Sequence, residues 1–277
     1  MCHSRENGNP DDNYHIQPMQ TITAVIPAKN EEKNIERCIK SVLWCNKIQV
    51  ICTGTDKTAE IAKRLGAEVV EKSKSDTDDF EELQRNLNWA NETASTDWVL
   101  RIDADEIVTP ELKTEIQSIL NFKFKISNLK LGDEIVAYGI PRKQNFLGTF
   151  LTGGDWAYDR LTRLFRPQFC SYSPIVKVHE QFQVKGSIGY LKGALLHYSH
   201  PDLSTLMKKF ESYTTLEAQQ LKETKLSACI KLLIVPPYVF LRWMIYHQGY
   251  KDGWVGVRAG AMRAYYDVML YSKFLRG

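Results

Sequence analysis

Several kinds of motif are missing from this sequence of 277 residues. Its six cysteines form no C-x-x-C pair, so neither a zinc ribbon nor a disulfide framework is expected, and a reduced, cytosolic chain fits better. Neither G-x-G-x-x-G nor G-x-x-x-x-G-K-[ST] occurs, which excludes the usual dinucleotide-binding and triphosphate-binding loops. A net charge of +3 is too small to indicate a nucleic-acid partner.

Long apolar stretches are also missing. No run reaches the roughly 18 consecutive apolar residues that read as a membrane-spanning helix, so none is expected. Residues 1–20 are polar and lack the apolar core of a signal peptide, which predicts a disordered tail. The hydrophobic content of 43% is nevertheless ordinary for a globular protein with a real core.

Strand and helix patterns alternate through the first half of the chain. Strand-like runs occur at 21–26, 48–52, 68–71 and 98–102, and helical patterns lie between them. This alternation predicts an α/β fold with a doubly wound, mostly parallel sheet, whose first strand is expected to stop at Pro27. After a helix that starts near Pro110, residues 121–133 are expected to form a loop. Short strand-like pieces at 134–141, 161–165, 175–178 and 191–198 are then expected to extend the sheet and build the second wall of a cleft.

The apolar run Trp98–Ile102 ends in three carboxylates, those of Asp103, Asp105 and Glu106. Burying unpaired carboxylates costs several kcal/mol each. We therefore expect these acids at the carboxyl end of the strand, where open α/β sheets bind ligands. Two aspartates one residue apart, together with an anionic ligand, are a typical seat for Mg²⁺ or Mn²⁺. The alternative is an acidic strand end that only caps the following helix.

The C-terminal part, residues 226–277, is apolar, aromatic and basic at once. Its most apolar stretch contains Pro236, Pro237 and Arg242, which make it too broken to cross a bilayer. Apolar residues, interfacial aromatics and cations together predict an amphipathic helix that lies in the plane of an anionic membrane surface. The alternative is a helical pair that packs on the domain.

Nine short motifs follow one another from Thr21 to the C-terminus. They are IPAKNEE at 26–32, TDKT at 55–58, QRN at 84–86, DADE at 103–106, IPRK at 140–143, GGDW at 153–156, RLFR at 163–166, VHE at 178–180 and LHYS at 196–199. In this set the chain resembles family 2 inverting glycosyltransferases of the GT-A fold, and especially bacterial lipopolysaccharide-core β-1,4-glucosyltransferases. One position departs from the family pattern, because Cys52 stands where an aspartate that helps hold the nucleotide base is expected. Cysteine cannot accept an N–H as a carboxylate does, so uridine specificity is less secure than the fold.

The resemblance implies a nucleotide-diphosphate sugar as donor, usually UDP-glucose, and a divalent Mn²⁺ or Mg²⁺ as cofactor. It implies Asp105 as a metal ligand, His197 as a further ligand, and Asp103 as a contact to the ribose or the same metal. A hydrogen-bonded core histidine is the alternative for His197. The nucleotide-sugar contacts that we predict are Pro27, Ala28, Lys29, Asn30, Glu31, Asp56, Arg85, Asp103 and Ala104.

The transfer reaction also needs a carboxylate that accepts the proton of the incoming hydroxyl. We predict Glu180 for this role and Asp155 second, because Gly153 and Gly154 before Asp155 would let the backbone approach a sugar closely. Acceptor binding is assigned to Trp156, Asp159 and Arg163. A basic set is expected to meet acceptor phosphates, or else to be a solvated face: Arg142, Lys143, Arg160, Arg163 and Arg166.

These observations predict a disordered tail at 1–20, a GT-A domain at 21–225 and a membrane-associating helical segment at 226–277. The GT-A domain divides into a nucleotide half, 21–106, and an acceptor half, 107–225. The expected enzyme works on the cytoplasmic face of the cell membrane, on a lipid-linked saccharide such as the lipopolysaccharide inner core or another cell-envelope glycan. A nucleotidyltransferase is a rival, although the chain lacks its glycine-rich loop. A catalytically inactive sugar-binding or scaffold protein is another, and Cys52 is its best argument.

Overall fold

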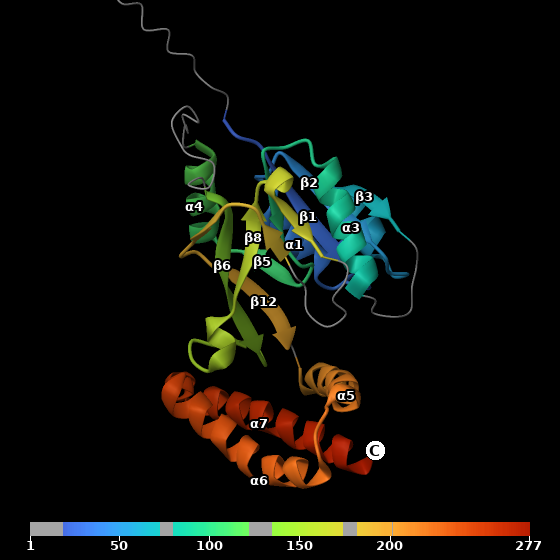
Figure 1. The fold of residues 1–277 in the computed structure, drawn as a ribbon. Coiled ribbons are helices and arrows are strands. Elements are labelled where there is room, and N and C mark those ends of the chain that lie inside the picture. Colours follow the sequence, from blue (N-terminus) through green and yellow to red (C-terminus); the bar gives the residue numbers. More distant parts are fainter. Residues whose placement is uncertain (1–18, 73–79, 122–134, 174–181, 201) are drawn as a thin grey trace, which may run out of the picture.

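The computed structural model of the chain describes residues 19–72, 80–121, 135–173, 182–200 and 202–277 (Figure 1). Its centre is a ten-stranded sheet. In the first half, β1 (Ile22–Ala28), β2 (Lys47–Cys52), β3 (Glu68–Glu71) and β4 (Trp98–Arg101) pair in parallel, in the spatial order β3-β2-β1-β4. The predicted strands therefore form one parallel block.

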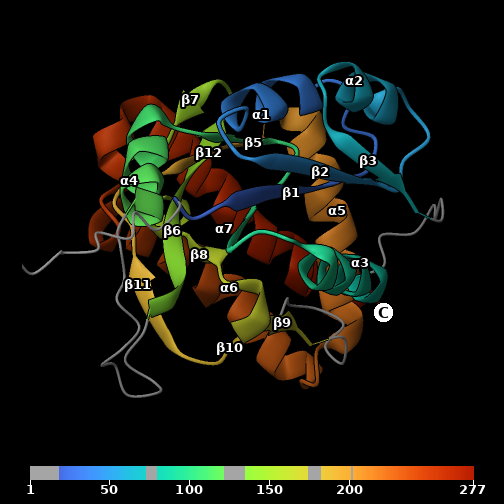
Figure 2. The same cartoon turned by 90° about the horizontal axis from the view of Figure 1, so that it is seen from above.

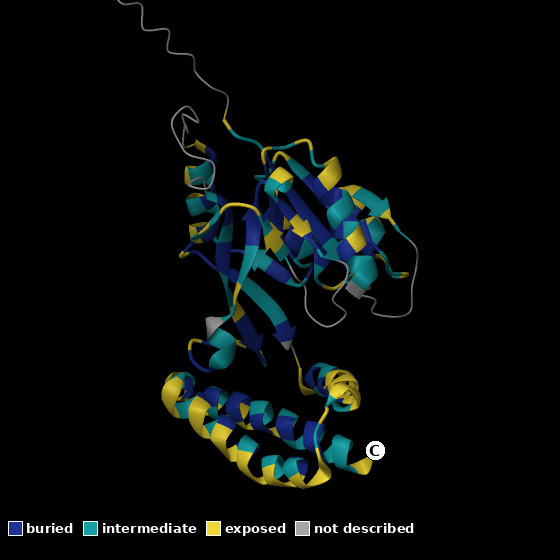
Figure 3. Ribbon diagram, in the orientation of Figure 1, coloured by how far each residue is buried: buried dark blue, intermediate teal, exposed yellow. Residues whose placement is uncertain are grey.

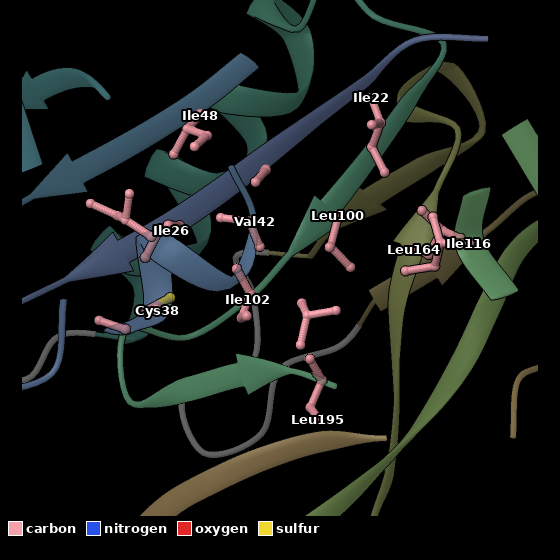
Figure 4. Packing of buried hydrophobic residues seen from close by; sticks show 14 of the residues in the cluster. Ile22, Ile26, Cys38, Val42, Ile48, Leu100, Ile102, Ile116, Leu164 and Leu195 are labelled. Atoms are coloured by element: carbon pink, nitrogen blue, oxygen red, sulfur yellow. The ribbon is translucent and has the colours of Figure 1, made fainter. Parts of the chain in front are cut away.

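Helices cover both faces of this block, as Figure 2 shows for α1 and α2 on one side and α3 on the other. The helices are α1 (Ile35–Ser41), α2 (Thr58–Arg64), α3 (Phe80–Thr93) and α4 (Pro110–Asn121). Alternate residues of β1 serve the two faces. Ile22 and Ile26 belong to one apolar cluster with Cys38 of α1 (Figure 4), and Val25 belongs to another with Leu87 of α3. The prediction of a doubly wound α/β sheet is confirmed.

The second half of the chain extends the sheet with mixed pairing. The strands are β5 (Glu106–Val108), β6 (Ile135–Phe146), β7 (Thr149–Phe150), β8 (Arg160–Phe165), β11 (Ser187–Tyr190) and β12 (Leu195–His200). The strand β8 is antiparallel to both β4 and β6, and β12 pairs with β6 in parallel and with β5 in antiparallel fashion. A separate antiparallel pair joins β9 (Cys170–Tyr172) to β10 (Phe182–Val184).

The chain ends in a helical layer beneath the sheet (Figure 1). It contains α5 (Leu203–Gln220), α6 (Lys225–Leu241), the π-helical turn η4 (Arg242–Tyr246), the 3₁₀ turn η5 (Gly249–Asp252) and α7 (Gly253–Arg276). Besides the apolar clusters on the two faces of the parallel block, a further cluster joins this layer to the sheet. It contains Phe146, Leu151, Phe210, Trp243 and Ala259. The predicted C-terminal helical appendage is therefore present and packs on the domain.

Two predictions about prolines are wrong. The strand β1 continues through Pro27 to Ala28, because its pairing with β4 ends at Val25 and the missing N–H interrupts no bond on that side. The helix α6 continues through Pro236 and Pro237, and Lys225–Tyr246 is long and apolar enough to span a membrane, with a mean hydropathy of 1.6. It is the one such helix among the residues that the structure describes, and length and composition alone support it.

Some expected elements cannot be compared with the structure. The tail up to residue 18, the loop after residue 121 and the strand at 175–178 lie outside the described residues.

Candidate functional site

Asp105 and His197 lie 92 residues apart in the sequence and meet in the structure. Asp105 directly precedes β5, and His197 lies opposite Glu106 in β12, so the pairing of these strands brings the two side chains together. His197 Nε2 lies 3.1 Å from Asp105 Oδ2, and the two side chains are 12% and 18% exposed. Burial raises the pKa of Asp105, but the hydrogen bond and charge of His197 outweigh burial and hold it below its usual range.

Asp103 and Glu106, which flank Asp105 closely in the sequence, form ion pairs with arginines. Arg163 of β8 donates to Asp103 Oδ2 at 2.5 Å, and the same nitrogen lies 3.7 Å from Glu106 Oε1. Arg101 lies 3.2 Å from the other oxygen of Asp103. Glu106 is fully buried and accepts the backbone N–H of Asp103 at 2.9 Å. The prediction that all three acids stand at the cleft mouth is wrong for Glu106, because arginines from neighbouring strands compensate its charge in the interior.

The two acids differ in pKa. Burial raises the pKa of Asp103, but the charges of Arg163, Arg101 and Arg142 outweigh burial and hold it well below its usual range. For Glu106, burial and the charge of Asp103 raise the pKa, and the charges of Arg163, His197 and Arg142 offset this only in part. The arginines thus lower the pKa of Asp103, whereas burial and Asp103 dominate for Glu106.

The basic set predicted to meet acceptor phosphates is mostly turned inward. Arg142 donates from Nε to Asp159 at 2.7 Å, and Arg166 lies 4.6 Å from the ring centre of Trp98. Arg163, predicted to bind the acceptor, is only 2% exposed. Its guanidinium pairs with Asp103 and Glu106 and compensates their charge, so this position does not suit a contact to the acceptor.

The loop after β1 is fastened to the loop after β2. Asn30 has a left-handed backbone, with φ of 55°, and its Oδ1 accepts the N–H of Thr55 at 2.9 Å. Gly54 is required here because a Cβ would lie 2.4 Å from the nitrogen of Asn30. Asp56 accepts the N–H of Glu32 at 3.0 Å. The predicted nucleotide contacts Asn30 and Asp56 thus shape the loop at the carboxyl end of β1.

Glu31 follows Asn30 in this loop, and its pKa is raised above the usual range. Burial raises its pKa most, the charge of Asp105 raises it further, and the hydrogen bond from Asn34 and the charge of Lys209 lower it. Glu31 therefore lies within electrostatic reach of both Asp105 and Lys209.

The other predicted nucleotide contacts differ in their position in the fold and in their exposure. Ala28 ends β1, and Ala104 is buried between the two aspartates. Arg85 is exposed on α3 and pairs with Glu81 at 2.6 Å. Cys52 is buried at the end of β2. Pro27 also belongs to β1, and Lys29 follows it half-buried.

A cleft of about 430 Å³ opens beside His197, within the range of small-molecule sites. It lies between β6, η2 (Asp155–Tyr158), β12 and α5. The second candidate base, Asp155, and the predicted acceptor residues Trp156 and Asp159 line it. Lys209 of α5 lines it as well, and sequence reasoning missed this residue, because one cation within an amphipathic helix carries no local signal. Glu180, the first candidate base, lies outside the described residues.

The segment before η2 is fastened to the C-terminal helices. The Asp252 carboxylate accepts the N–H of Thr152 at 3.0 Å, its hydroxyl at 2.5 Å, and the N–H of Gly153 at 2.9 Å. Gly154 has φ of +80°, and a Cβ there would lie 2.2 Å from the ring of Trp243. These glycines allow close approach to the helical layer, whereas the sequence had suggested close approach to a sugar.

Asp155 and Trp156 continue this attachment. Arg242 and Arg263 lie 3.4 Å and 3.7 Å from Asp155 Oδ2, and Trp156 packs edge-on against Trp243 with ring centres 5.1 Å apart. One wall of the cleft is therefore held by the C-terminal helices.

The donor atoms at Asp105 and His197 suit a hard divalent cation. No group of three His, Cys, Asp or Glu side chains that could hold a metal occurs within the described ranges. Mg²⁺ and Mn²⁺ are commonly held by one or two protein ligands together with substrate phosphates. Nδ1 of His197 is buried without a hydrogen-bond partner among the described residues, so the ring's bonding is incomplete without a further group. Asp105 and His197, called the metal pair below, therefore fit a site that a metal and a diphosphate would share.

Comparisons with known proteins give consistent relatives. A family model described as glycosyl transferase family 2 matches residues 23–126. The lipopolysaccharide core biosynthesis glycosyltransferase LpsC of Rhizobium meliloti is 28% identical over 228 residues, 81% of each chain. The uncharacterized glycosyltransferase RT0209 of Rickettsia typhi is 30% identical over 213 residues, 73% of this chain and 68% of that protein.

Solved structures show weaker overall similarity. Glucosyl-3-phosphoglycerate synthase of Mycobacterium tuberculosis is 25% identical, with a TM-score of 0.33 over 46% of this chain and 44% of the other. The TarS 1–349 fragment of S. aureus is 12% identical, with a TM-score of 0.41 over 92% of this chain and 89% of the other.

Proposed function

The chain belongs to glycosyl transferase family 2, and on that premise we propose that it moves a hexose from a nucleotide-diphosphate sugar to a lipid-linked saccharide with inversion. The observation that carries the proposal is the contact between Asp105 and His197 beside the polar cleft. The name of LpsC supports an acceptor such as the lipopolysaccharide core. Glucose and uridine diphosphate are the donor groups that we propose, although Cys52 offers no carboxylate to the base.

The chain's own residues divide the chemistry among them. Asp105 and His197 would hold Mn²⁺ or Mg²⁺, which neutralises charge on a departing diphosphate when bound. The loop from Pro27 to Glu31 lies at the carboxyl edge of β1, where α/β sheets bind nucleotides. Asp103 keeps its assignment to the ribose or the metal, with 26% of its side chain exposed.

The proton acceptor remains a choice between two carboxylates. Glu180 is the first candidate on its motif, and Asp155 is the second because it lines the cleft. Trp156 and Asp159 share that wall, and we assign them to the acceptor sugar.

The outer side of α6 is proposed to rest on an anionic membrane surface. Exposed positions run along α6 (Figure 3). Its exposed apolar residues follow helical spacing and include Leu226, Ile230, Leu233, Ile234 and Tyr238. Residues 225–277 contain eight Lys or Arg and two Asp, a net charge of +6, which leaves −3 for the rest of a chain whose total is +3. Apolar surface and positive charge together match an anionic lipid surface.

An in-plane position agrees better with the packing than a membrane-spanning one. The helix α6 lies along α7, and Arg242 at its end pairs with Asp155 of the cleft wall. The helix is thus attached along one side to the enzyme. The proposed location is the cytoplasmic face of the cell membrane.

The proposal is tested by Mn²⁺-stimulated hydrolysis of UDP-glucose and of other sugar nucleotides by the purified protein. Asp105→Asn and His197→Ala should each abolish the stimulation, whereas Glu111→Gln, at an exposed acid of α4, should not. Full stimulation in the Asp105→Asn variant would contradict the proposal.

The same preparation identifies the base when a membrane extract supplies the acceptor. The amide substitution at the true base should reduce transfer roughly 10²-fold or more without weakening nucleotide binding. Glu180→Gln and Asp155→Asn are the two variants to compare.

A further inference from the structure

Lys209 occupies a distinctive position in the cleft. It projects from α5, is half-buried, and lines the cleft together with His197 and Ser199. Its Nζ donates to the backbone oxygen of Ser199 at 3.0 Å. An ammonium group has three N–H donors, so two remain after this bond.

Lys209 lines the same cleft as His197, whose Nε2 lies 3.1 Å from Asp105 Oδ2. No ion pair of Lys209 occurs within the part of the chain that the structure describes. The ammonium therefore lies in the cleft beside His197 and has two N–H donors left for a ligand.

A diphosphate entering this site meets several carboxylates and needs cations on more than one side. Arg142 and Arg163 are already paired with Asp159, Asp103 and Glu106. Lysine is a common phosphate-binding residue because its charge is compact and its donors rotate. We infer that Lys209 binds phosphate oxygens of the diphosphate group in the cleft that it lines together with His197. The inference rests on the proposed function. It adds the ammonium group of Lys209 to the divalent ion that the same site is proposed to hold.

A plainer role would leave Lys209 as a counter-charge that only stabilises the acids. That role predicts unchanged affinity for pyrophosphate when Lys209 is removed. If Lys209 binds phosphate, Lys209→Ala should weaken pyrophosphate binding yet leave Mn²⁺ binding unchanged or tighter, because a like charge near the metal pair is gone. If the variant merely damages the site, both affinities should fall.

The test uses isothermal titration of the full chain with inorganic pyrophosphate and with UDP, in Mn²⁺ and in EDTA. Pyrophosphate makes the result independent of the nucleotide base. Lys209→Ala should lose about tenfold or more in affinity for pyrophosphate in Mn²⁺, since a hydrogen bond to a charged group is removed. Lys209→Arg should recover most of that affinity. Lys208→Ala, at the exposed neighbouring lysine, should bind as the wild type does.

Three outcomes separate the claims. Wild-type affinity for pyrophosphate in Lys209→Ala would overturn the inference and leave the proposed function intact. Failure of the wild-type chain to bind either UDP or pyrophosphate in Mn²⁺ would overturn both. A parallel loss of Mn²⁺ and pyrophosphate affinity in Lys209→Ala would assign the residue to the structure of the site and overturn the inference.

Discussion

Arg163→Ala separates the two roles considered for that arginine. If Arg163 bound the acceptor, its removal would raise the acceptor KM and leave stability nearly unchanged. The structure instead places its guanidinium 2.5 Å from Asp103 and 3.7 Å from Glu106, with 3% of the side chain exposed. Removing one partner of a buried ion pair leaves an uncompensated charge and costs about 3–5 kcal/mol.

The assay is thermal or urea unfolding of the full chain. A cost of that size corresponds to a fall in Tm of roughly 6–20 °C, at about 2–4 °C per kcal/mol for domains of this size. Arg160→Ala is the matched control, because Arg160 starts the same strand and is exposed. Its substitution should change stability by about 0.5 kcal/mol or less.

The pH dependence gives a second signature. A carboxyl whose folded pKa is lowered, as for Asp103, contributes stability above its unfolded pKa and loses it as pH falls through the folded pKa. In Arg163→Ala, burial acts on Asp103 with less opposition, so the carboxyl takes up a proton at higher pH. The stability gap from wild type should therefore be larger at pH 7.5 than at pH 5. Equal Tm values for Arg163→Ala and Arg160→Ala would refute this reasoning.

Two further predictions concern the C-terminal helices. Asp252→Ala removes the acceptor of three hydrogen bonds from Thr152 and Gly153 and should cost about 1.5–3 kcal/mol. Faster amide exchange at 152–154 would show the loosened wall, and unchanged exchange there would contradict the attachment. Leu233→Glu with Ile234→Glu should weaken binding to phosphatidylglycerol vesicles at least tenfold, since each buried side chain contributes about 1.5–3 kcal/mol. Leu43→Glu, exposed elsewhere, is the control, and equal binding by both proteins would contradict the membrane surface.

The first half of the fold was predictable because its signals are local. The strands β1–β4 and helices α1–α3 follow from hydrophobic periods of two and 3.6 residues. Gly66, which follows the C-cap residue Leu65 of α2, has φ of +83°, a conformation that favours glycine at this position. The assignment of Asp105 and His197 to a metal was implied by the resemblance and stays a prediction. The sheet pairing that brings the two side chains together became visible only in the structure.

The rest depends on contacts between distant parts of the chain. The three-residue strand β5 is defined by its pairing with β12, which no local pattern encodes. The burial of Glu106 depends on arginines of β6 and β8, so an acid that looked exposed is in the interior. Gly153 and Gly154 were correctly singled out as sites of close approach, but the approaching group is the helical layer.

The central claim is that Asp105 and His197 together hold the divalent ion that a diphosphate shares. The most direct measurement is the anomalous scattering of manganese in crystals grown with Mn²⁺ and UDP. The account predicts one manganese bound to a carboxylate oxygen of Asp105 and a ring nitrogen of His197, with diphosphate oxygens completing its sphere. Bound UDP without manganese at these two residues would contradict it.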